Sequence, residues 1–355
     1  LFNLAEAGNI YSRIMNPTCD VLEQRIAAME GGAAALCVAS GMAAITASMQ
    51  TRCAACDNFV SVSQLYGGTY NLFAHTFPQQ GIEVRMASGD DIPALEALID
   101  ENTKAIFCES IGNPAGNIID LAAVSEMAHK HQIPVVVDNT VATPYLCRPF
   151  EHGADIVIHS LTKYIGGHGT TIGGIIVDSG KFPFKDNPRF DQFNTPDPSY
   201  HGVVYAEALE APFIGRARVV PLRNMGAALS PFNAFLILQG LETLALRMDR
   251  HVENAMVVAK HLKNNAQISW VNYAGLESDK YHEMAKRMAS GKPSAIISFG
   301  IKGGEEAGAK FIDALLMIKR LVNIGDAKSL ACHPASTTHR QLNEDELKTA
   351  GVSAD

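Results

Sequence analysis

The chain has 355 residues, of which 47% are hydrophobic and 19% are charged, and its formal net charge is −8. A chain of this length and composition can form two domains, or one large domain with an appendage, and can bury a substantial hydrophobic core. The negative charge argues against nucleic acid as a partner, because phosphate binding depends on basic patches. No apolar run approaches the roughly 20 residues of a membrane span, so no membrane partner is expected either.

The chain begins with Leu1 rather than Met and shows no signal peptide, so we expect the natural N-terminus to be missing. Of its seven cysteines only Cys53 and Cys56 form a CxxC pair, and a redox or metal function would need a partner pair. The twelve histidines are dispersed, which predicts no metal site. Scattered free thiols fit a reducing compartment, and a cytoplasmic location is predicted.

Short apolar segments alternate with helical segments over the first half of the chain. Several of the apolar segments are unbroken Val and Ile runs, which is typical of strands covered on both faces. This alternation predicts an α/β fold with a mostly parallel, doubly wound sheet. Helices are predicted at 20–29 and 120–131, and strands at 35–39, 59–63, 83–86, 105–109, 135–138, 156–159 and 174–177.

The pattern changes after residue 180. Residues 180–229 are polar and rich in turn residues, and we interpret them as an excursion that forms a flap or an interface element. A long amphipathic helix is predicted over 231–263. A strand at 295–300 and a helix at 305–318 then predict a smaller α/β domain.

Two predicted strands end in residues that carry chemistry. Asp138 ends one of them, and Ser160, Thr162 and Lys163 follow the other. Ligands of doubly wound sheets bind beyond the carboxyl ends of the strands. Pyridoxal phosphate (PLP) needs a lysine for its Schiff base, an acid opposite its ring nitrogen, and hydroxyl and amide donors for its phosphate. On Lys163 and Asp138 alone, an exposed loop lysine and a helix cap remain an alternative.

A phosphate site is predicted where Ser40, Gly41 and Met42 follow a strand and open an Ala-rich helix. Backbone N–H groups at a helix N-terminus bind anions, and Gly allows close approach. Ser160 and Thr162 can add hydroxyl donors. A plain strand-to-helix turn would show the same pattern, so the alternative stays open.

Weaker candidates lie past two other strand ends. Tyr66 could stack on a flat ring, and Asn113 could donate to a ring oxygen, although a core tyrosine and a common Asn-Pro turn explain them equally well. The Gly-rich run 166–174 matches neither the Walker pattern nor GxGxxG, and we interpret it as a link to the next strand. A nicotinamide dehydrogenase is excluded because no GxGxxG motif follows the first predicted strand.

Together these motifs resemble the Cys/Met-metabolism family of PLP enzymes, which has the aspartate-aminotransferase (type I) fold. The resemblance covers essentially the whole chain. It implies residues 1–15 as part of an arm that reaches a neighbouring subunit, 16–232 as the PLP-binding domain, and 233–355 as a small C-terminal domain, incomplete at its end. The motifs that carry it lie at 11–18, 40–44, 65–69, 137–140, 160–163 and 333–339.

The resemblance implies a role for each candidate residue. Lys163 would form the Schiff base, Asp138 would keep the ring nitrogen protonated, and Tyr66 would stack on the ring and assist the leaving group. Tyr11 and Arg13 would reach the phosphate of the neighbouring subunit's PLP, which implies a catalytic dimer and a homotetramer of two such dimers. The full set of expected cofactor contacts is Tyr11, Arg13, Ser40, Gly41, Met42, Tyr66, Asn113, Asp138, Ser160, Thr162 and Lys163.

On the substrate side, Asn323, Thr338 and Tyr11 are the expected contacts. The family's carboxylate-binding arginine follows a stretch that corresponds to residues 351–355, so we expect it beyond Asp355 and expect residues to be missing at both ends. Such an arginine would bind the substrate carboxylate as a bidentate clamp.

Finer features favour the O-acetylhomoserine sulfhydrylases within the family: segments 65–73, 144–153 and 323–329, and the long excursion. They imply γ-replacement on O-acetyl-L-homoserine by a sulfur nucleophile, which gives L-homocysteine and acetate in methionine biosynthesis. The methionine γ-lyase pattern has Cys in place of Gly68 and Ser in place of Asn323, and both differences count against that lyase.

Other functions stay open at this point. Cystathionine γ-synthase, cystathionine γ-lyase and methionine γ-lyase share the same cofactor residues, and a catalytically silent PLP-binding protein is an alternative of another class. The sulfur donor is also open, between free sulfide, a thiol and a sulfur-carrier protein with a C-terminal thiocarboxylate. The choice between an acetyl and a succinyl ester, and the balance of γ-replacement and γ-elimination, are not decided by the sequence.

Overall fold

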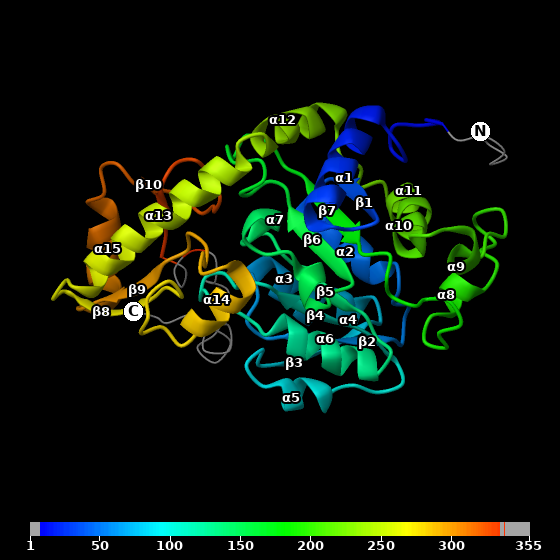
Figure 1. Ribbon diagram of the computed structural model, residues 1–355, viewed down its shortest axis with the longest axis horizontal. Helices are drawn as coiled ribbons and strands as arrows, with labels where there is room; N and C mark the ends of the chain where they lie inside the picture. Colours follow the sequence, from blue (N-terminus) through cyan, green and yellow to red (C-terminus); the bar gives the residue numbers. More distant parts are fainter. Residues whose placement is uncertain (1–7, 334–336, 338–355) are drawn as a thin grey trace.

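The computed structural model describes residues 8–333 and Thr337. Its core is a seven-stranded sheet in the order β1-β7-β6-β5-β4-β2-β3 (Figure 1). All seven predicted strands of the first half of the chain are confirmed, with small changes at their ends. Their bounds are β1 Ala34–Val38, β2 Asn58–Val62, β3 Glu83–Ala87, β4 Thr103–Glu109, β5 Val135–Asp138, β6 Ile156–Ser160 and β7 Gly174–Asp178.

The sheet is parallel except at β7, which runs antiparallel to both β1 and β6. This follows from the Gly-rich link after β6, which returns the chain directly to the next strand without a crossover helix. The prediction of a mostly parallel sheet is therefore confirmed, and the link at 166–174 has the expected role. Because β4, β5 and β6 are parallel neighbours, their carboxyl ends lie at the same edge of the sheet.

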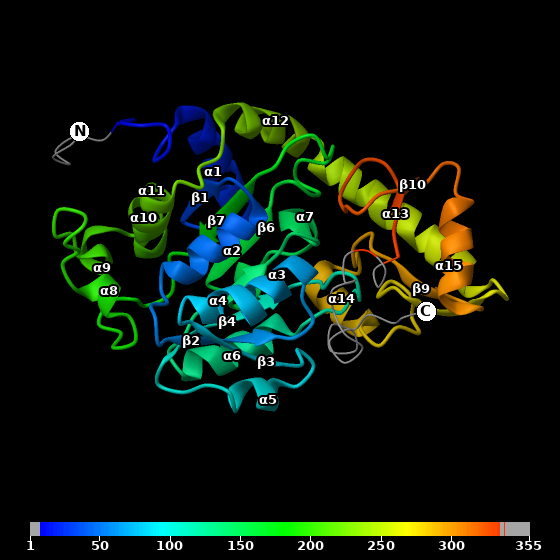
Figure 2. The same cartoon turned by 180° about the vertical axis from the view of Figure 1, so that it is seen from behind.

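Helices cover both faces of this sheet. Helices α1 (Pro17–Glu30) and α6 (Leu121–Lys130) lie on the face seen in Figure 1, and α2 (Gly41–Gln50) lies on the face seen in Figure 2. The side chains of Val135, Val136 and Val137 are fully buried between these layers, as their unbroken apolar run predicts. The predicted helices at 20–29 and 120–131 are thus confirmed, and Asp120 caps α6 by accepting the N–H of Ala123.

The predicted long helix over 231–263 is wrong in one respect, since it consists of α12 (Pro231–Leu241) and α13 (Leu244–Lys263). The break is stabilised by Arg247, whose guanidinium donates to the carbonyl oxygens of Gly240 and Tyr164 at 2.7 and 2.6 Å. It therefore adds to the bonds that the backbone N–H and the hydroxyl of Thr243 already make to the Gly240 carbonyl, and it ties α13 to the loop after β6. The periodicity of the apolar residues continues through the break and does not reveal it.

Gly240 allows α12 to approach the loop after β6. A Cβ at this position would lie 2.1 Å from the carbonyl oxygen of Gly166, which is backbone and cannot rotate away. We expect Gly240→Ala to lower the free energy of unfolding by about 1–3 kcal/mol, the usual cost of overpacking, in a denaturant titration. The control is Gly308→Ala in helix α15 (Gly304–Asp313), where the nearest atom would be 3.8 Å away. An unchanged Gly240→Ala midpoint would contradict the close approach.

The excursion after β7 contains a buried apolar cluster that its polar, turn-rich sequence does not predict. It contains short helices, and five of its phenylalanines are buried and in contact with one another, in both stacked and edge-to-face pairs. The irregular spacing of these residues among Pro and Asn hides this cluster from periodicity. The cluster consists of Phe182, Phe184, Phe190, Phe193 and Phe213.

The rest of the chain forms a second lobe beside the sheet (Figures 1 and 2). In it β8 (Ile268–Asn272) pairs antiparallel with β9 (Ser298–Ile301), and β10 (Lys319–Arg320) pairs parallel with β11 (Leu330–Ala331). The strand predicted at 295–300 is therefore found slightly later. The helix predicted at 305–318 is α15 (Gly304–Asp313), which ends early because the chain turns there to pair β10 with β11.

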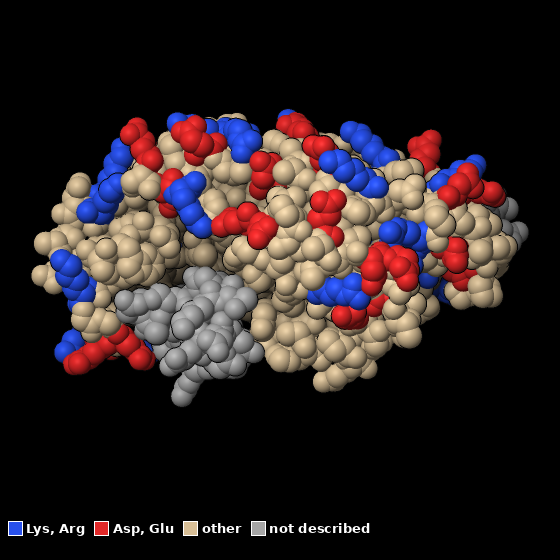
Figure 3. Space-filling model, turned by 90° about the horizontal axis from the view of Figure 1, so that it is seen from below, with Lys and Arg blue, Asp and Glu red and all other residues tan. Residues whose placement is uncertain are grey.

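Shorter helices complete the fold, and no helix among the described residues is long and apolar enough to cross a membrane. On the face drawn in Figure 3, acidic and basic side chains are intermingled. The remaining α-helices of the described residues are α3 Gly67–Asn71, α4 Phe77–Gln79, α5 Ile92–Glu96, α7 Thr143–Leu146, α8 Asp191–Asn194, α9 Tyr205–Ala208, α10 Pro212–Ala217, α11 Arg223–Met225 and α14 His282–Ala289.

Candidate active site

Asp138 and Ser160 end neighbouring strands and are connected through Thr140. The carboxylate of Asp138 accepts the backbone N–H of Thr140 at 3.0 Å, and the hydroxyl of Thr140 accepts the N–H of Ser160 at 2.8 Å. Burial raises the pKa of the Asp138 carboxyl, and the hydrogen bonds from Thr140 oppose that rise. The ends of β5 and β6 are therefore held together as one rigid edge.

Lys163 lies in the turn that follows β6, and its amine points toward the second lobe. Its Nζ donates to Oδ1 of Asn323 at 2.6 Å. Burial lowers the pKa of the Lys163 amine, because the low-dielectric surroundings disfavour its charged form. A lysine whose amine is more readily neutral can act as a nucleophile or as a base.

Gly325 allows the second lobe to pack closely against Lys163. Its φ is +77°, and a Cβ there would lie 2.6 Å from the carbonyl carbon of Lys163. Only glycine satisfies both the left-handed conformation and the close approach. As a result the segment with Asn323 packs directly on the Lys163 turn, so the predicted residue Asn323 lies in the site.

The predicted phosphate site is assembled at the start of α2. The Oγ of Ser40 caps this helix by accepting the N–H of Ala43 at 3.1 Å. A Cβ at Gly41 would lie only 2.7 Å from the Cβ of Ser160, so the helix start and the end of β6 are in contact. Met42 follows and packs partly against the core. The first N–H groups of the helix are thus beside a strand-end hydroxyl, where an anion can be bound.

Thr162 also belongs to this edge, but its hydroxyl already has partners. Its Oγ1 accepts the N–H of Gly173 at 3.2 Å and lies 3.3 Å from the carbonyl oxygen of the same residue. These bonds fix the turn between β6 and β7. Any further bond from this hydroxyl to a phosphate would compete with the one to the carbonyl.

Tyr66 and Asn113 lie beyond β2 and β4, and both of their backbone N–H groups donate to the carboxylate of Glu109. The bond from Tyr66 is 2.7 Å long. The Tyr66 side chain is 41% exposed, so its ring is available to a ligand rather than buried in the core. This exposure argues against the core-tyrosine alternative.

Tyr11 and Arg13 lie elsewhere in the described chain. The guanidinium of Arg13 donates to the carbonyl oxygen of Arg223 and lies 5.1 Å from the centre of the Tyr11 ring. Tyr11 is 58% exposed, so it presents its ring to solvent in a single subunit. Thr338, the other expected substrate contact, lies outside the described residues.

Two features of the site were not predicted. Glu109, at the end of β4, is the register partner of Asp138, and its position after an apolar strand is the same signal that identified Asp138. His159 forms a hydrogen bond of 2.5 Å with Glu30 at the end of α1, and both side chains are fully buried. No local pattern could reveal this second pair, because its members are 129 residues apart.

These residues fit PLP. The start of α2 and Ser160 offer donors to a phosphate, and Gly41 allows these two groups to lie close together. Lys163 provides a desolvated amine, and Asp138 provides a half-buried carboxyl at the next strand end. The set therefore contains the lysine, the acid and the anion site that this cofactor requires.

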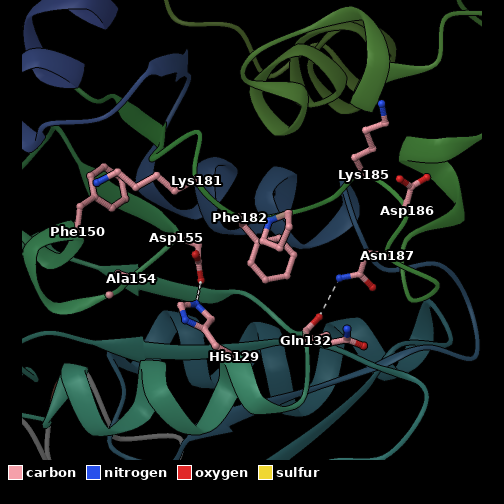
Figure 4. A pocket seen from close by; sticks show the side chains of 12 residues that line it. His129, Gln132, Phe150, Ala154, Asp155, Lys181, Phe182, Lys185, Asp186 and Asn187 are labelled. Carbon is pink, nitrogen blue, oxygen red and sulfur yellow. Dashed lines mark hydrogen bonds and ion pairs between the residues drawn. The ribbon is translucent and has the colours of Figure 1, made fainter.

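A cavity of about 540 Å³ lies at the opposite edge of the sheet (Figure 4). Its wall includes Asp155, which precedes β6, accepts the N–H of Val135 at the start of β5, and pairs with His129 at 2.9 Å. It is therefore at the amino ends of the strands that carry Asp138 and Ser160 at their carboxyl ends. Among the described residues, none that is predicted to contact cofactor or substrate lines this cavity, so it is not the predicted site.

Comparison with known proteins extends these observations. A homocysteine synthase of Schizosaccharomyces pombe is 52% identical over 100% of this chain and 83% of its own length. An O-acetyl-L-homoserine sulfhydrylase of Leptospira meyeri is 50% identical over 99% of this chain and 82% of its own. Both matches extend far beyond the site, so they concern the whole fold.

Two crystal structures have the same architecture. A Campylobacter jejuni protein described as an O-acetylhomoserine (thiol)-lyase, with an N'-pyridoxyl-lysine-5'-monophosphate residue, has a TM-score of 0.97 and 46% identity and covers 99% of this chain and 84% of that one. The Corynebacterium glutamicum metB structure has a TM-score of 0.83 and 34% identity, with coverage of 96% and 80%. The type I fold predicted from the motifs is confirmed.

The family described as Cys/Met metabolism PLP-dependent enzyme matches residues 2–355. This match, the relatives at about half identity and the structural likeness all agree with the chemistry of the strand-end residues. The chain belongs to the Cys/Met metabolism family of PLP-dependent enzymes.

Proposed function

We propose that this enzyme catalyses γ-replacement on O-acetyl-L-homoserine with a sulfur nucleophile. With hydrogen sulfide, the bond between Cγ and the ester oxygen breaks, a bond between Cγ and sulfur forms, and L-homocysteine and acetic acid are released. The observation that carries the proposal is the similarity over the full chain to relatives named homocysteine synthase and O-acetyl-L-homoserine sulfhydrylase. The geometry around Lys163 supports it.

Lys163 is the proposed general base. PLP, when bound, supplies an electron sink that stabilises negative charge at the substrate Cα. The lowered pKa of the Lys163 amine increases its neutral fraction near pH 7, so that Nζ can take the proton from Cα and later return it. Asn323 holds Nζ by accepting one of its hydrogens. Asp138 is proposed to hold the proton on the ring nitrogen with its carboxylate.

Tyr66 is proposed to act on the side of Cγ. Its ring is accessible, and its backbone is fixed by Glu109 at the end of β4. The phenol O–H can donate to the oxygen of the departing acetate, which lowers the charge that develops there. Ser40, Gly41, Met42, Ser160 and Thr162 are proposed to bind the phosphate, and Asn113 the ring oxygen.

The test uses protein loaded with PLP and O-acetyl-L-homoserine, with and without sulfide, and assays homocysteine and 2-oxobutyrate together. Homocysteine that depends on sulfide, with little 2-oxobutyrate, would support γ-replacement. Formation of 2-oxobutyrate without sulfide as the main product would identify a γ-lyase instead. No turnover in either arm, with PLP bound, would indicate a silent PLP-binding protein.

The identity of the nucleophile and of the ester is tested in the same assay. We propose free sulfide and the acetyl ester, because the relatives named after O-acetyl-L-homoserine match the whole chain. Cysteine in place of sulfide tests for a cystathionine γ-synthase, and O-succinyl-L-homoserine tests the other ester. A carrier protein with a C-terminal thiocarboxylate would be indicated if sulfide alone were a poor donor.

Gly68 controls the position of the Tyr66 ring. A Cβ at residue 68 would lie 2.6 Å from Cε1 of that ring, so a side chain there displaces it. We expect Gly68→Ala to leave the free energy of unfolding within about 1 kcal/mol, because the exposed ring can rotate outward, and to lower kcat/KM. Thermal unfolding and steady-state kinetics measure both. Unchanged kcat/KM would mean that the ring position is unimportant. The control is Gly308→Ala, where φ is also not positive and the nearest atom would be 3.8 Å from the added Cβ.

We propose that the enzyme is a cytoplasmic homotetramer of two catalytic dimers. Residues 8–15 would belong to the arm that reaches a neighbouring subunit, with 16–232 as the PLP-binding domain and the chain from 233 as the small domain. The exposed ring of Tyr11 supports this arm, and the free thiols support a reducing compartment. Light scattering should give about four times 38.1 kDa, and the mass of one chain would contradict the assembly.

A further inference from the structure

Glu109 and Asp138 are carboxyl groups on neighbouring parallel strands, at the same level of the ladder. Partners in such a ladder are about 4.8 Å apart along the hydrogen-bonding direction, and their side chains point to the same face. Two ionised carboxylates in this position repel each other, and Glu109 is only 5% exposed, so water screens the repulsion poorly. The arrangement is stable only if a proton or a cation is associated with the pair.

The other contacts of Glu109 fix the ligand side of the site. One of its oxygens accepts the N–H of Tyr66 at 2.7 Å, and the carboxylate also accepts the N–H of Asn113. These bonds hold the two segments that carry the proposed ring contacts. Neither of these backbone N–H groups carries a formal positive charge, so the two bonds do not neutralise the negative charge of Glu109 and Asp138.

The charged and titratable groups around the pair come from several elements. His159 on β6 lowers the pKa of Asp138 by its charge, but its Nε2 is engaged by Glu30 of α1. Cys108 precedes Glu109 on β4, and burial raises the pKa of its thiol, so it stays neutral. The close arrangement of Glu109 and Asp138 is therefore the main electrostatic conflict at this edge of the sheet.

We propose that Glu109 is a positioning residue that, together with Asp138, holds one proton in the cofactor-free enzyme and gives it up when PLP binds. The bond between the proton and a carboxyl oxygen breaks as the ring nitrogen approaches Asp138. The proton passes to the ring nitrogen if that atom arrives unprotonated, and to solvent water if it arrives protonated. In both cases the site ends with two carboxylates beside one pyridinium.

The direction of the pKa of Glu109 agrees with this geometry. Burial, and next the charge of Asp138, raise the pKa of Glu109 well above its usual range, which favours one shared proton on the pair. A pyridinium beside Asp138 would lower it again, because an opposite charge favours the ionised form. The inference rests on PLP binding with its ring nitrogen at Asp138, as proposed above, and not on the sulfur chemistry.

The test is calorimetric titration of the cofactor-free full chain with PLP at pH 7, in buffers of different ionisation enthalpy, for the native enzyme and Glu109→Gln. Glu109→Gln has no shared proton to give up. Its net proton uptake per PLP bound should therefore be about one proton higher than that of the native enzyme. Glu109→Asp keeps a carboxyl and should restore the native count. Equal proton counts for the native enzyme and Glu109→Gln would overturn the proposal.

Two controls separate proton transfer from loss of structure. A PLP analogue with carbon in place of the ring nitrogen cannot form a pyridinium, so the difference between native and Glu109→Gln protein should vanish with it. Asp178→Asn removes another buried carboxyl with a raised pKa of about 6, at the end of antiparallel β7, and should leave the count unchanged. A difference that persists with the analogue would assign it to altered packing and reject the proposal.

The same pair should affect the stability of the cofactor-free protein. A carboxyl whose pKa is raised in the folded state stabilises it below the ordinary pKa, and this contribution is lost as the pH rises through the folded value. As the pH rises from the ordinary pKa of 4.5 toward the raised value, the native protein should therefore lose free energy of unfolding relative to Glu109→Gln. Parallel pH dependences of the free energy of unfolding would also count against a shared proton.

These tests are separate from the test of the proposed function. If PLP binds and sulfide-dependent homocysteine forms, but the proton counts and pH dependences are not as expected, the proposed function stands and the inference about Glu109 does not.

Discussion

Lys163→Ala is expected to abolish turnover of O-acetyl-L-homoserine. The side chain provides both the amine that bonds with the cofactor and the proposed base at Cα. Loss of a positioned general base alone lowers a rate by about 10²–10⁴-fold, and loss of the covalent attachment adds to this. The visible absorbance of the bound cofactor should change as well, because no lysine amine is left to bond with it. Homocysteine formation and absorbance spectra measure the two effects.

Lys104→Ala is the matched control for this substitution. Lys104 is also largely buried, and its Nζ donates to the carbonyl oxygen of Arg189 at 2.7 Å, but it lies at the start of β4 rather than at the carboxyl ends of the strands. Its loss should lower stability and leave the absorbance of the bound cofactor unchanged. Appreciable turnover by Lys163→Ala would contradict the assignment of the base and attachment site.

Asp138→Asn is expected to leave PLP bound and to slow proton removal from Cα. Asparagine keeps an oxygen that can accept the N–H of Thr140, so the end of β5 should retain its shape. It removes the charge that holds a proton on the ring nitrogen, and loss of one such electrostatic partner costs about 10²–10³-fold in kcat. Exchange of the substrate α-proton with deuterated water measures this step directly.

The control is again Asp178→Asn, which removes a buried carboxyl away from the ring nitrogen. This variant should keep the native rate of α-proton exchange even if its free energy of unfolding falls. A native exchange rate in Asp138→Asn would show that the ring nitrogen has another partner. Failure of Asp138→Asn to bind PLP would show that the carboxylate is needed for binding rather than for proton removal.

The sequence by itself determined the central sheet and the candidate residues at its edge. Strands β4, β5 and β6 each contain an unbroken, fully buried apolar stretch, at 105–108, 135–137 and 156–158, and such stretches depend only on local composition. Because parallel strands present their carboxyl ends at one edge, Asp138 and Lys163 could be placed in one site from their positions after those runs. The cap of α6 at Asp120 is also local, since it involves residues three apart.

Tertiary structure decided what surrounds these residues. The bond from Lys163 to Asn323 joins residues 160 apart, and the close approach of Gly325 depends on how the second lobe docks. The interruption between α12 and α13 depends on Arg247, which reaches carbonyl groups in another segment. The phenylalanines after β7 cluster although their spacing has no period.

The role of Glu109 lies between these two cases. Its position at a strand end is visible in the sequence, but its contact with Tyr66 and its pairing with Asp138 require the strand order and the register. Periodicity, capping and strand-end position arise from interactions between residues close in sequence, so the sequence reveals them. Charge pairing, close packing and the partners of buried side chains arise between residues far apart in the chain, and only the folded structure brings these together.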